Sequence, residues 1–215
     1  MMPRLAVALL VGVSVTAPVS GAVIYTALPN IPVFQGDLFP ATQRLDLNSD
    51  GAWDIEFYAH DDIFKVTTAG SLHVSAIPAT PPNQGSDLWP YSANEDINSI
   101  LPGGASWVTG DSFFYGCALF GESLVCLGLW GNGVNHLGFR IEEDDGFHYG
   151  YITVDTPFLG IHGGFIQGFG YESTPNTSIR AGAIPEPSTV SLLIGGLIAV
   201  FGRRRRDKQG IIGSP

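Results

Sequence analysis

The stretch "LGFRIEEDDGFHYGYITVD" (residues 137–155) contains two runs in which apolar and polar side chains alternate. Successive side chains of a β-strand point to opposite faces, so the runs at 137–143 and 148–155 each predict a strand. Asp144, Asp145 and Gly146 lie between the two runs, and Asp-Gly is a favoured sequence for tight hairpin turns. The stretch therefore predicts a β-hairpin.

Similar runs occur earlier in the chain, at residues 54–60, 71–77, 113–120 and 123–130. Glycine accounts for 28 of 215 residues, well above the usual share of about 7%, and most glycines lie between short apolar runs. Residues 78–92 are rich in proline and predict an exposed, irregular loop. We therefore expect residues 23–182 to form an all-β domain, an antiparallel β-sandwich or jelly roll.

The net charge of −10 is unevenly distributed along the chain. Residues 23–184 hold 18 of the 20 acidic residues but only four basic ones, which gives this part a formal charge of −14. Such a surface repels phosphate backbones, so the composition argues against nucleic-acid binding. It favours an exterior domain that attracts divalent cations.

The N-terminus has the form of a secretory signal peptide over residues 1–22. Arg4 precedes an apolar run from Leu5 to Val15, and Ser20 and Ala22 supply the small residues of a cleavage site before Val23. An uncleaved membrane helix is the alternative, but the apolar run is short for a membrane span. We expect a cleaved signal helix and export of the residues that follow.

A second apolar segment, Val190–Phe201, lies near the C-terminus. As a helix it would span roughly 18 Å, against about 30 Å for the hydrocarbon core of a bilayer. Four arginines follow it and would hold its end in the cytoplasm: Arg203, Arg204, Arg205 and Arg206. We predict a single, weak transmembrane helix with the rest of the chain outside.

The residues Pro185, Glu186 and Pro187 precede this segment. The two prolines favour extended backbone, which a membrane protease can grip. Together with Ser188, Thr189, the short apolar segment and the basic cluster, they resemble the PEP-CTERM sorting signal, here over residues 183–208. An ordinary tail anchor with a chance Pro-Glu-Pro is the alternative.

The resemblance implies recognition by an exosortase, a membrane transpeptidase, and removal of the tail. It implies a transient anchor in the inner membrane and a final place in the bacterial envelope or extracellular space. Residues 209–215 depart from the pattern, because tails of this family end soon after the basic cluster.

The last third of the chain carries a second resemblance, to the end of a common group of PEP-CTERM ectodomains. The matching segments are Gly138–Arg140, His148–Gly150, Tyr171–Pro175 and Ala181–Gly182. Tyr151 stands where that group has tryptophan. The resemblance implies architecture and location, and it provides no assigned catalytic role to carry over to this chain.

The segment "LDLNSDGAWDIEF" (45–57) matches the start of a calcium loop. Its ligand positions are filled by Asp46, Asn48, Asp50, Ala52 (through its carbonyl) and Asp54, with Gly51 at the sharp turn. Position 12 is Phe57 instead of the bidentate glutamate of an EF-hand, so the fragment resembles the loops of dockerins and thrombospondin-type repeats. The prediction is a calcium site; a turn closed by Asx hydrogen bonds alone is the alternative.

The chain has two cysteines, Cys117 and Cys126. A two-residue turn at Gly121-Glu122 places them opposite each other at a non-hydrogen-bonded position, where Cα atoms come closest. Export permits oxidation, so we predict a disulfide, with two buried free thiols as the alternative.

Other catalytic signals are weak. The five histidines form no close-spaced metal pair, and the acidic segments 60–62 and 142–145 are interpreted as an exposed turn and a solvated hairpin tip. Serine-elbow, phosphate-loop and dinucleotide glycine patterns are absent from the sequence. We therefore predict a non-enzymatic surface or matrix protein that associates with exopolysaccharide. A carbohydrate-binding module with a defined glycan ligand and a secreted hydrolase remain the alternatives.

Overall fold

The computed structural model describes residues 21–34, 41–60, 63–78, 86–120, 123–157 and 163–185, and between 115 and 127 it describes the backbone alone. Most of the predicted sorting signal and signal peptide lies outside these residues. The predictions concerned are the signal peptide up to residue 20, Glu186, Pro187, the transmembrane helix 190–201, and the membrane stop of Arg203, Arg204, Arg205 and Arg206. Within the described residues, no helix has the length and apolar character needed to cross a bilayer.

The described part of the chain is all-β, as the sequence predicts. Its strands are β1 (Val23–Phe34), β2 (Ala41–Leu45), β3 (Ile55–His60), β4 (Ile63–Thr68), β5 (Leu72–Ile77), β6 (Ser86–Leu88), β7 (Pro90–Tyr91), β8 (Asp96–Ile97), β9 (Ser106–Val108), β10 (Asp111–Phe120), β11 (Ser123–Leu127), β12 (Gly133–Glu143), β13 (Gly146–Thr156), β14 (Gly163–Glu172) and β15 (Ile179–Arg180).

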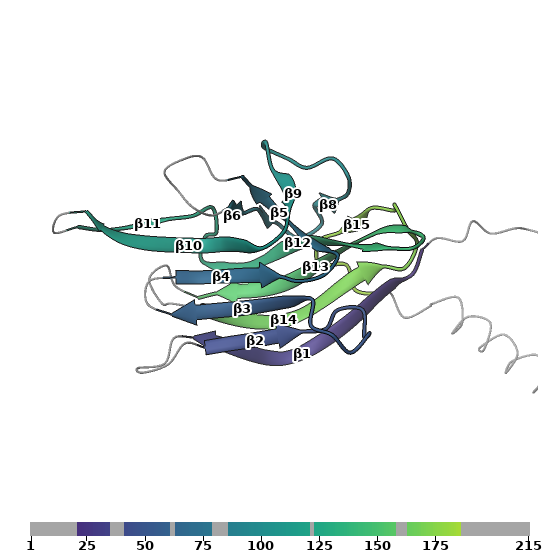
Figure 1. Cartoon of the computed structure of the whole chain (residues 1–215), viewed down its shortest axis with the longest axis horizontal. Helices are drawn as coiled ribbons and strands as arrows, with labels where there is room; N and C mark the ends of the chain where they lie inside the picture. Colours follow the sequence, from purple (N-terminus) through teal and green to yellow (C-terminus); the bar gives the residue numbers. More distant parts are fainter. Residues whose placement is uncertain are drawn as a thin grey trace, which may run out of the picture.

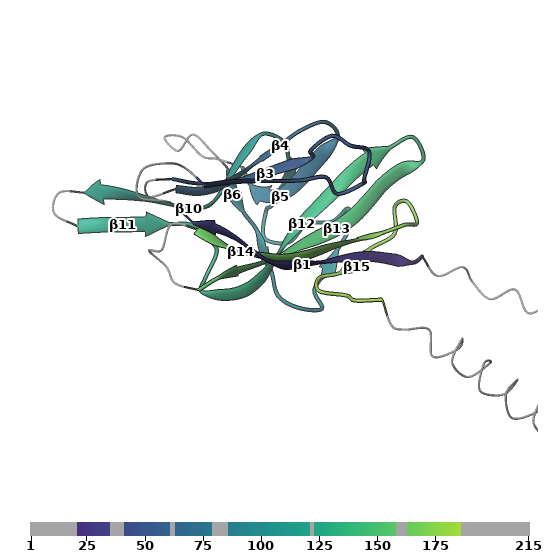
Figure 2. The same cartoon turned by 90° about the horizontal axis from the view of Figure 1, so that it is seen from below.

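Thirteen of these strands join one sheet in the order β1-β14-β13-β12-β5-β6-β10-β4-β3-β2, with β7, β9 and β11 paired to its members. The sheet curls until its first strand, β1, contacts β2 and β3 at the other edge (Figure 1). Figure 2 shows the result as two facing layers, with β3, β4 and β10 in one and β14 and β1 in the other. The described residues thus form a nearly closed, continuous sheet and do not show the two separate sheets of the expected sandwich.

The main core fills the space inside this curl, and strand periodicity explains its composition. In β3, Ile55, Phe57 and Ala59 are fully buried and alternate with partly exposed residues. Aromatic rings form the centre of the core: the Phe64 and Phe114 rings stack with centroids 4.2 Å apart, and Trp130 meets Phe114 edge-on at 4.5 Å. Each such side chain contributes roughly 1.5–3 kcal/mol by leaving water.

Two glycines show how closely the strands and rings approach each other. A Cβ on Gly150 would lie 2.2 Å from the Phe139 ring, and one on Gly163, where φ is +146°, would lie 1.9 Å from the Val33 carbonyl oxygen. Any other residue would have to displace backbone or a core ring at these positions. Glycine is therefore a packing requirement at Gly150 of β13 and at Gly163 of β14.

A second, smaller cluster closes one end of the domain. It consists of Tyr91, Ile97, Tyr149, Tyr151, Ile179 and Ala181. Val23, the first residue of β1, and Ala183, close to the end of the described chain, both pack against it. The two ends of the domain therefore lie at the same pole, which we call the terminal pole.

The central hairpin is confirmed, because β12 and β13 pair from Gly133–Thr156 to Glu143–Gly146 around a two-residue turn. The predicted strands at 54–60, 71–77, 113–120 and 123–130 correspond to β3, β5, β10 and β11. The predicted irregular loop at 78–92 is wrong for its second half, because β6 and β7 lie there and Leu88 and Tyr91 are buried. Pro90 is tolerated since β7 is a two-residue strand with a short pairing to β12.

The predicted pairing of the cysteine hairpin is confirmed at the level of the backbone. Cys117 lies opposite Cys126, and Phe120 lies opposite Ser123. This hairpin, β10–β11, projects from the end of the molecule opposite the terminal pole (Figure 1).

The disulfide itself stays a prediction, and mass spectrometry tests it. We expect the intact protein, prepared without reductant, to be two hydrogen atoms lighter than the reduced protein. Because the closed loop is short, replacing both cysteines with serine should cost near the low end of about 2–4 kcal/mol. Identical masses before and after reduction would show free thiols.

Candidate functional site

The folded part of the chain ends in a short segment, residues 179–183, which we call the C-terminal clasp. Strand β15 pairs with β8 through Ile179–Ile97 and Arg180–Asp96. The Ala181 amide then donates to the Glu95 carbonyl (2.8 Å), and the Ala181 carbonyl accepts from the Asn94 amide (2.9 Å). These bonds fix the backbone up to the start of the predicted sorting signal.

The clasp ends abruptly at Ala183. The Tyr151 hydroxyl donates to the Ala183 carbonyl, and Ala183 is half-buried. The next residue, Ile184, is 64% exposed, and Pro185 is also exposed. The transition from packed to accessible chain therefore takes place within two residues, directly before the Pro-Glu-Pro.

The buried side chain of His136 packs against the C-terminal clasp. His136 is 6% exposed, and its Nδ1 shares a hydrogen bond with the Thr153 hydroxyl (3.1 Å). Gly182 lies against it with φ at +75°, so close that a Cβ there would be 3.0 Å from two ring atoms. Burial lowers the pKa of His136, which keeps the ring neutral beneath the clasp.

The predicted calcium loop is closed by hydrogen bonds from its own backbone. Asp46 accepts from the amides of Ser49 (2.6 Å) and Gly51 (2.9 Å). Asn48 accepts from the Asp50 amide (3.1 Å), and Asp50 accepts from the Ala52 amide (2.7 Å). This is the Asx-turn arrangement that the sequence leaves as the alternative to a metal site.

Asp54, the last predicted ligand of the loop, is buried. Its Oδ2 accepts from the Leu47 amide (2.7 Å), while its own amide donates to the Leu45 carbonyl (2.9 Å). Burial raises the pKa of Asp54, and the nearby carboxylates of Asp50 and Asp46 add to the effect. Asp54 therefore connects the two sides of the loop through hydrogen bonds to Leu47 and Leu45.

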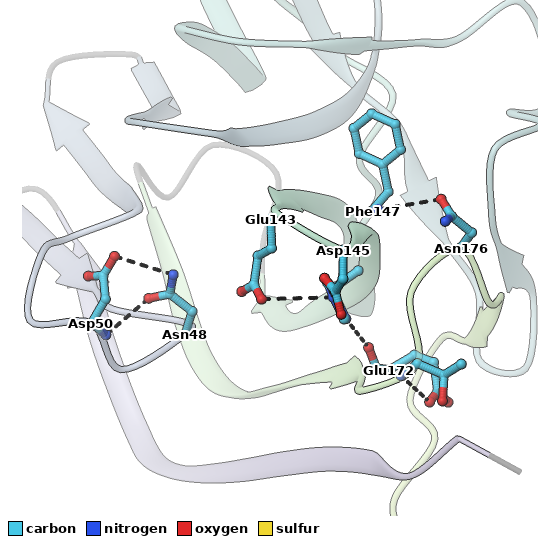
Figure 3. Close-up of polar contacts among 9 residues, drawn as sticks. Asn48, Asp50, Glu143, Asp145, Phe147, Glu172 and Asn176 are labelled. Carbon is cyan, nitrogen blue, oxygen red and sulfur yellow. Dashed lines mark hydrogen bonds and ion pairs between the residues drawn. The ribbon is translucent and has the colours of Figure 1, made fainter. Parts of the chain in front are cut away.

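The loop borders an open acidic depression of about 480 Å³. Asn48 and Asp50 line it from the loop, Ser71 also lines it, and the tip of the β12–β13 hairpin supplies Glu142, Glu143, Asp144 and Asp145. Figure 3 shows Asn48 and Asp50 on one side and Glu143 and Asp145 on the other. The fold thus joins two acidic segments that lie about 90 residues apart in the sequence.

Within the described residues, one group of three donor side chains could hold a metal ion: Glu143, Asp145 and His148. The His148 Nε2 lies 3.0 Å from Asp145 Oδ1 and 3.8 Å from Glu143 Oε2. His148 is 5% exposed, and its Nδ1 lies 2.9 Å from the Glu172 carbonyl oxygen. The structure thus assembles a group of metal-ligand type at the hairpin and not within the 46–54 loop.

The histidine and the carboxylates of this group shift one another's pKa values toward the charged forms. Burial alone would lower the pKa of His148, but its hydrogen bonds to Asp145 and to the Glu172 carbonyl outweigh burial and raise it. In turn the hydrogen bond from His148 lowers the pKa of Asp145. The hydrogen bonds and the two exposed carboxylates therefore favour the protonated form of the His148 imidazole.

The sequence pattern predicts a solvated hairpin tip at residues 142–145 and assigns no role to His148. The exposure of the four acidic residues is confirmed. Pairing of Glu143 with Gly146 and of Ile141 with His148 puts Glu143 and His148 on one face of the hairpin. The proximity of Glu143 and His148 could have been predicted from the sequence, because a two-residue hairpin turn at Asp144-Asp145 already places these residues on the same face.

Comparison with known proteins identifies the C-terminal segment. Residues 183–206 match the family described as the PEP-CTERM protein-sorting motif, which confirms the resemblance noted above. The motif implies an exosortase as processing partner, export, and membrane-anchored sorting at the C-terminus. The match includes the whole basic cluster, so Arg203, Arg204, Arg205 and Arg206 belong to the motif. No curated protein and no solved structure matches the chain.

The buried imidazole beneath the clasp predicts an acid sensitivity. Because the pKa of His136 is lower in the folded state than the ordinary value of 6.5, the unfolded chain binds more protons below about pH 6.5. The stabilisation is therefore present above that pH and is lost as the pH falls through the folded-state pKa. We expect His136→Gln to reduce the drop in melting temperature between about pH 7.5 and about pH 5.5.

Thr42→Ser, which alters an exposed side chain on β2 and changes no titratable group, serves as the control and should keep the wild-type pH dependence. Equal drops in melting temperature for His136→Gln and the wild type would contradict the prediction.

Proposed function

We propose that this chain, which carries a PEP-CTERM protein-sorting motif at residues 183–206, is an exported, non-enzymatic protein of the bacterial envelope or extracellular matrix that an exosortase processes. The observation that carries the proposal is the junction at the terminal pole. The clasp holds residues 179–183 in the fold, and Ile184 and Pro185 emerge directly beyond it. A membrane enzyme can then bind the motif without unfolding the domain.

The position of both ends favours the same topology. Val23, which follows the predicted signal peptide, and Ala183, which begins the motif match, pack on the same small cluster. A domain held to the membrane by its tail would therefore keep the site of signal-peptide cleavage on the membrane side too. In this proposal the signal peptide is removed first, the apolar segment 190–201 and Arg203–Arg206 hold the chain in the inner membrane, and the exosortase then releases the domain.

The role of the released domain follows from its surface charge. Residues 23–184 carry a formal charge of −14, and several of the acids gather in the depression between the 46–54 loop and the hairpin. Such a surface would bind divalent cations among exopolysaccharide chains. This proposal includes calcium binding in the 46–54 loop, where Asn48 and Asp50 border the depression. A calcium ion in the loop would have to compete with the backbone amides of Gly51 and Ala52, which donate hydrogen bonds to the carboxylates of Asp46 and Asp50.

A specific glycan-binding role is the second candidate, because of a pocket at the terminal pole. It has a volume of about 290 Å³ and is lined by Trp89, Tyr91, Glu95, Asp96, Ile100, Leu101 and Pro102. An aromatic ring beside carboxylates suits a sugar, whose apolar face stacks and whose hydroxyls donate. Glycan-array binding that Trp89→Ala abolishes would favour this candidate over a purely cohesive role.

Processing in cells that contain an exosortase tests the main proposal. We expect the wild-type chain to lose its tail and reach the envelope or medium, while Glu186→Ala accumulates in the membrane with its tail attached. Loss of a recognised charge costs about 1.5–3 kcal/mol, so processing should fall about tenfold or more.

Asp207→Ala is the matched control, because Asp207 is an acidic residue just beyond the matched segment. It should be processed like the wild type. Recovery of an intact wild-type chain from the cytosol, or equal processing of Glu186→Ala and the wild type, would overturn the proposal.

A further inference from the structure

We propose that Glu143, Asp145 and His148 form a binding site for a divalent transition-metal ion, and that zinc is the ion that suits their donor atoms best. Their three donor atoms lie within 4.8 Å of one another. This site is separate from the sorting motif and from the 46–54 loop.

The spacing of the donors fits a small ion. Zinc bonds to nitrogen and oxygen of about 2.0–2.1 Å put neighbouring ligands of a tetrahedron about 3.4 Å apart. The observed separations of 3.0 Å (His148 Nε2 to Asp145 Oδ1) and 3.8 Å (His148 Nε2 to Glu143 Oε2) lie on either side of that value. The side chains of Glu143 and Asp145 are 43% and 59% exposed, so small rotamer changes can bring their oxygens into place.

The His148 imidazole has the second hydrogen bond that is typical of metal-binding histidines. A carbonyl oxygen can only accept, so the short contact with Glu172 requires a proton on His148 Nδ1. That proton position leaves Nε2 as the nitrogen that faces the two carboxylates. A second hydrogen bond of this kind fixes the tautomer and orientation of a ligating imidazole.

The donor set also selects the class of ion. Calcium takes 6–8 oxygen ligands and magnesium keeps several waters, whereas imidazole suits zinc, copper, iron and nickel. With one imidazole and two carboxylates, the group leaves a fourth tetrahedral position, which water can fill from the adjoining depression.

A bound ion would join the hairpin tip to the edge of the domain that contains its first residue. His148 is hydrogen-bonded to Glu172, the last residue of β14, and Glu172 lies opposite Val23 in the β1–β14 pairing. Glu143 is the last residue of β12, and Asp145 lies in the exposed turn. The ion would therefore cross-link the end of β12, the turn and β13, and the His148–Glu172 hydrogen bond would connect this cross-link to β14.

Calorimetric titration of the full chain in detergent micelles with zinc chloride tests the site. Asp145→Asn and Asp144→Asn make the same chemical change in the same exposed turn, but only Asp145 belongs to the group. We expect Asp145→Asn to weaken zinc binding by about 10- to 100-fold or more, and Asp144→Asn to leave it within about threefold of the wild type. Zinc should raise the melting temperature of the wild type and of Asp144→Asn, but not that of Asp145→Asn.

Glu143→Gln provides a second exposed ligand variant and should behave like Asp145→Asn. Both variants alter exposed side chains, so loss of the fold does not confuse the result. Equal zinc affinity of Asp145→Asn, Glu143→Gln and the wild type would overturn the site. Equal weakening by Asp144→Asn and Asp145→Asn would show general attraction by negative charge instead. Tighter binding of calcium than of zinc at these residues would overturn the proposed class of ion.

Discussion

The pairing of β1 with β14 is the constraint on which the rest of this structure depends. It joins residues near the start of the domain to residues near its end, from Val23–Glu172 to Phe34–Gly163, and it places β1 where this strand contacts β2 and β3 at the other edge of the curled sheet. The approach is possible because β14 has glycine where the strands are closest: a Cβ on Gly168 would lie 2.8 Å from the Thr26 carbonyl oxygen. The domain can therefore close only when nearly all of its chain is present.

Because of this pairing, the candidate functional features lie at opposite ends of the domain. The beginning of β1, the C-terminal clasp and the acidic hairpin tip meet at the terminal pole, while the cysteine hairpin lies at the other end (Figure 2). The sorting motif therefore leaves the fold beside the first residue of the domain. Since a folded clasp ends at Ala183, the domain can complete its folding outside the membrane and still offer the motif to an enzyme at the membrane surface.

The sequence was sufficient for features that depend on local pattern. Alternation in 137–155 predicted the β12–β13 hairpin, and a two-residue turn predicted the Cys117–Cys126 pairing, because short-range geometry sets both. It was insufficient for β1 and β14. In β1, Pro29 and Pro32 break the pattern and Asn30, with φ at +48°, marks an irregularity in the register. In β14, four glycines in ten residues suggest turns, and only the close contacts with the neighbouring strands β1 and β13 explain them.

The candidate sites also differ in how far the sequence alone identifies them. The sorting motif is a linear pattern, so the order of residues along the chain is enough to identify it. The group of Glu143, Asp145 and His148 depends on a hairpin turn and on the Glu172 carbonyl, which lies 24 residues beyond His148. The resemblance of 46–54 to a calcium loop rests on side-chain order alone, and the fold satisfies those oxygens with amides.

The packing of the folded domain ends at Ala183, directly before the Pro-Glu-Pro of the sorting motif. Amide hydrogen exchange of the full chain in micelles measures that boundary residue by residue. We predict strong protection at Asn94 and Ala181, whose amides are hydrogen-bonded within the clasp, and free exchange at the exposed Ile184. Exchange at Ala181 as fast as at Ile184 would show that the clasp is open, and would contradict the account.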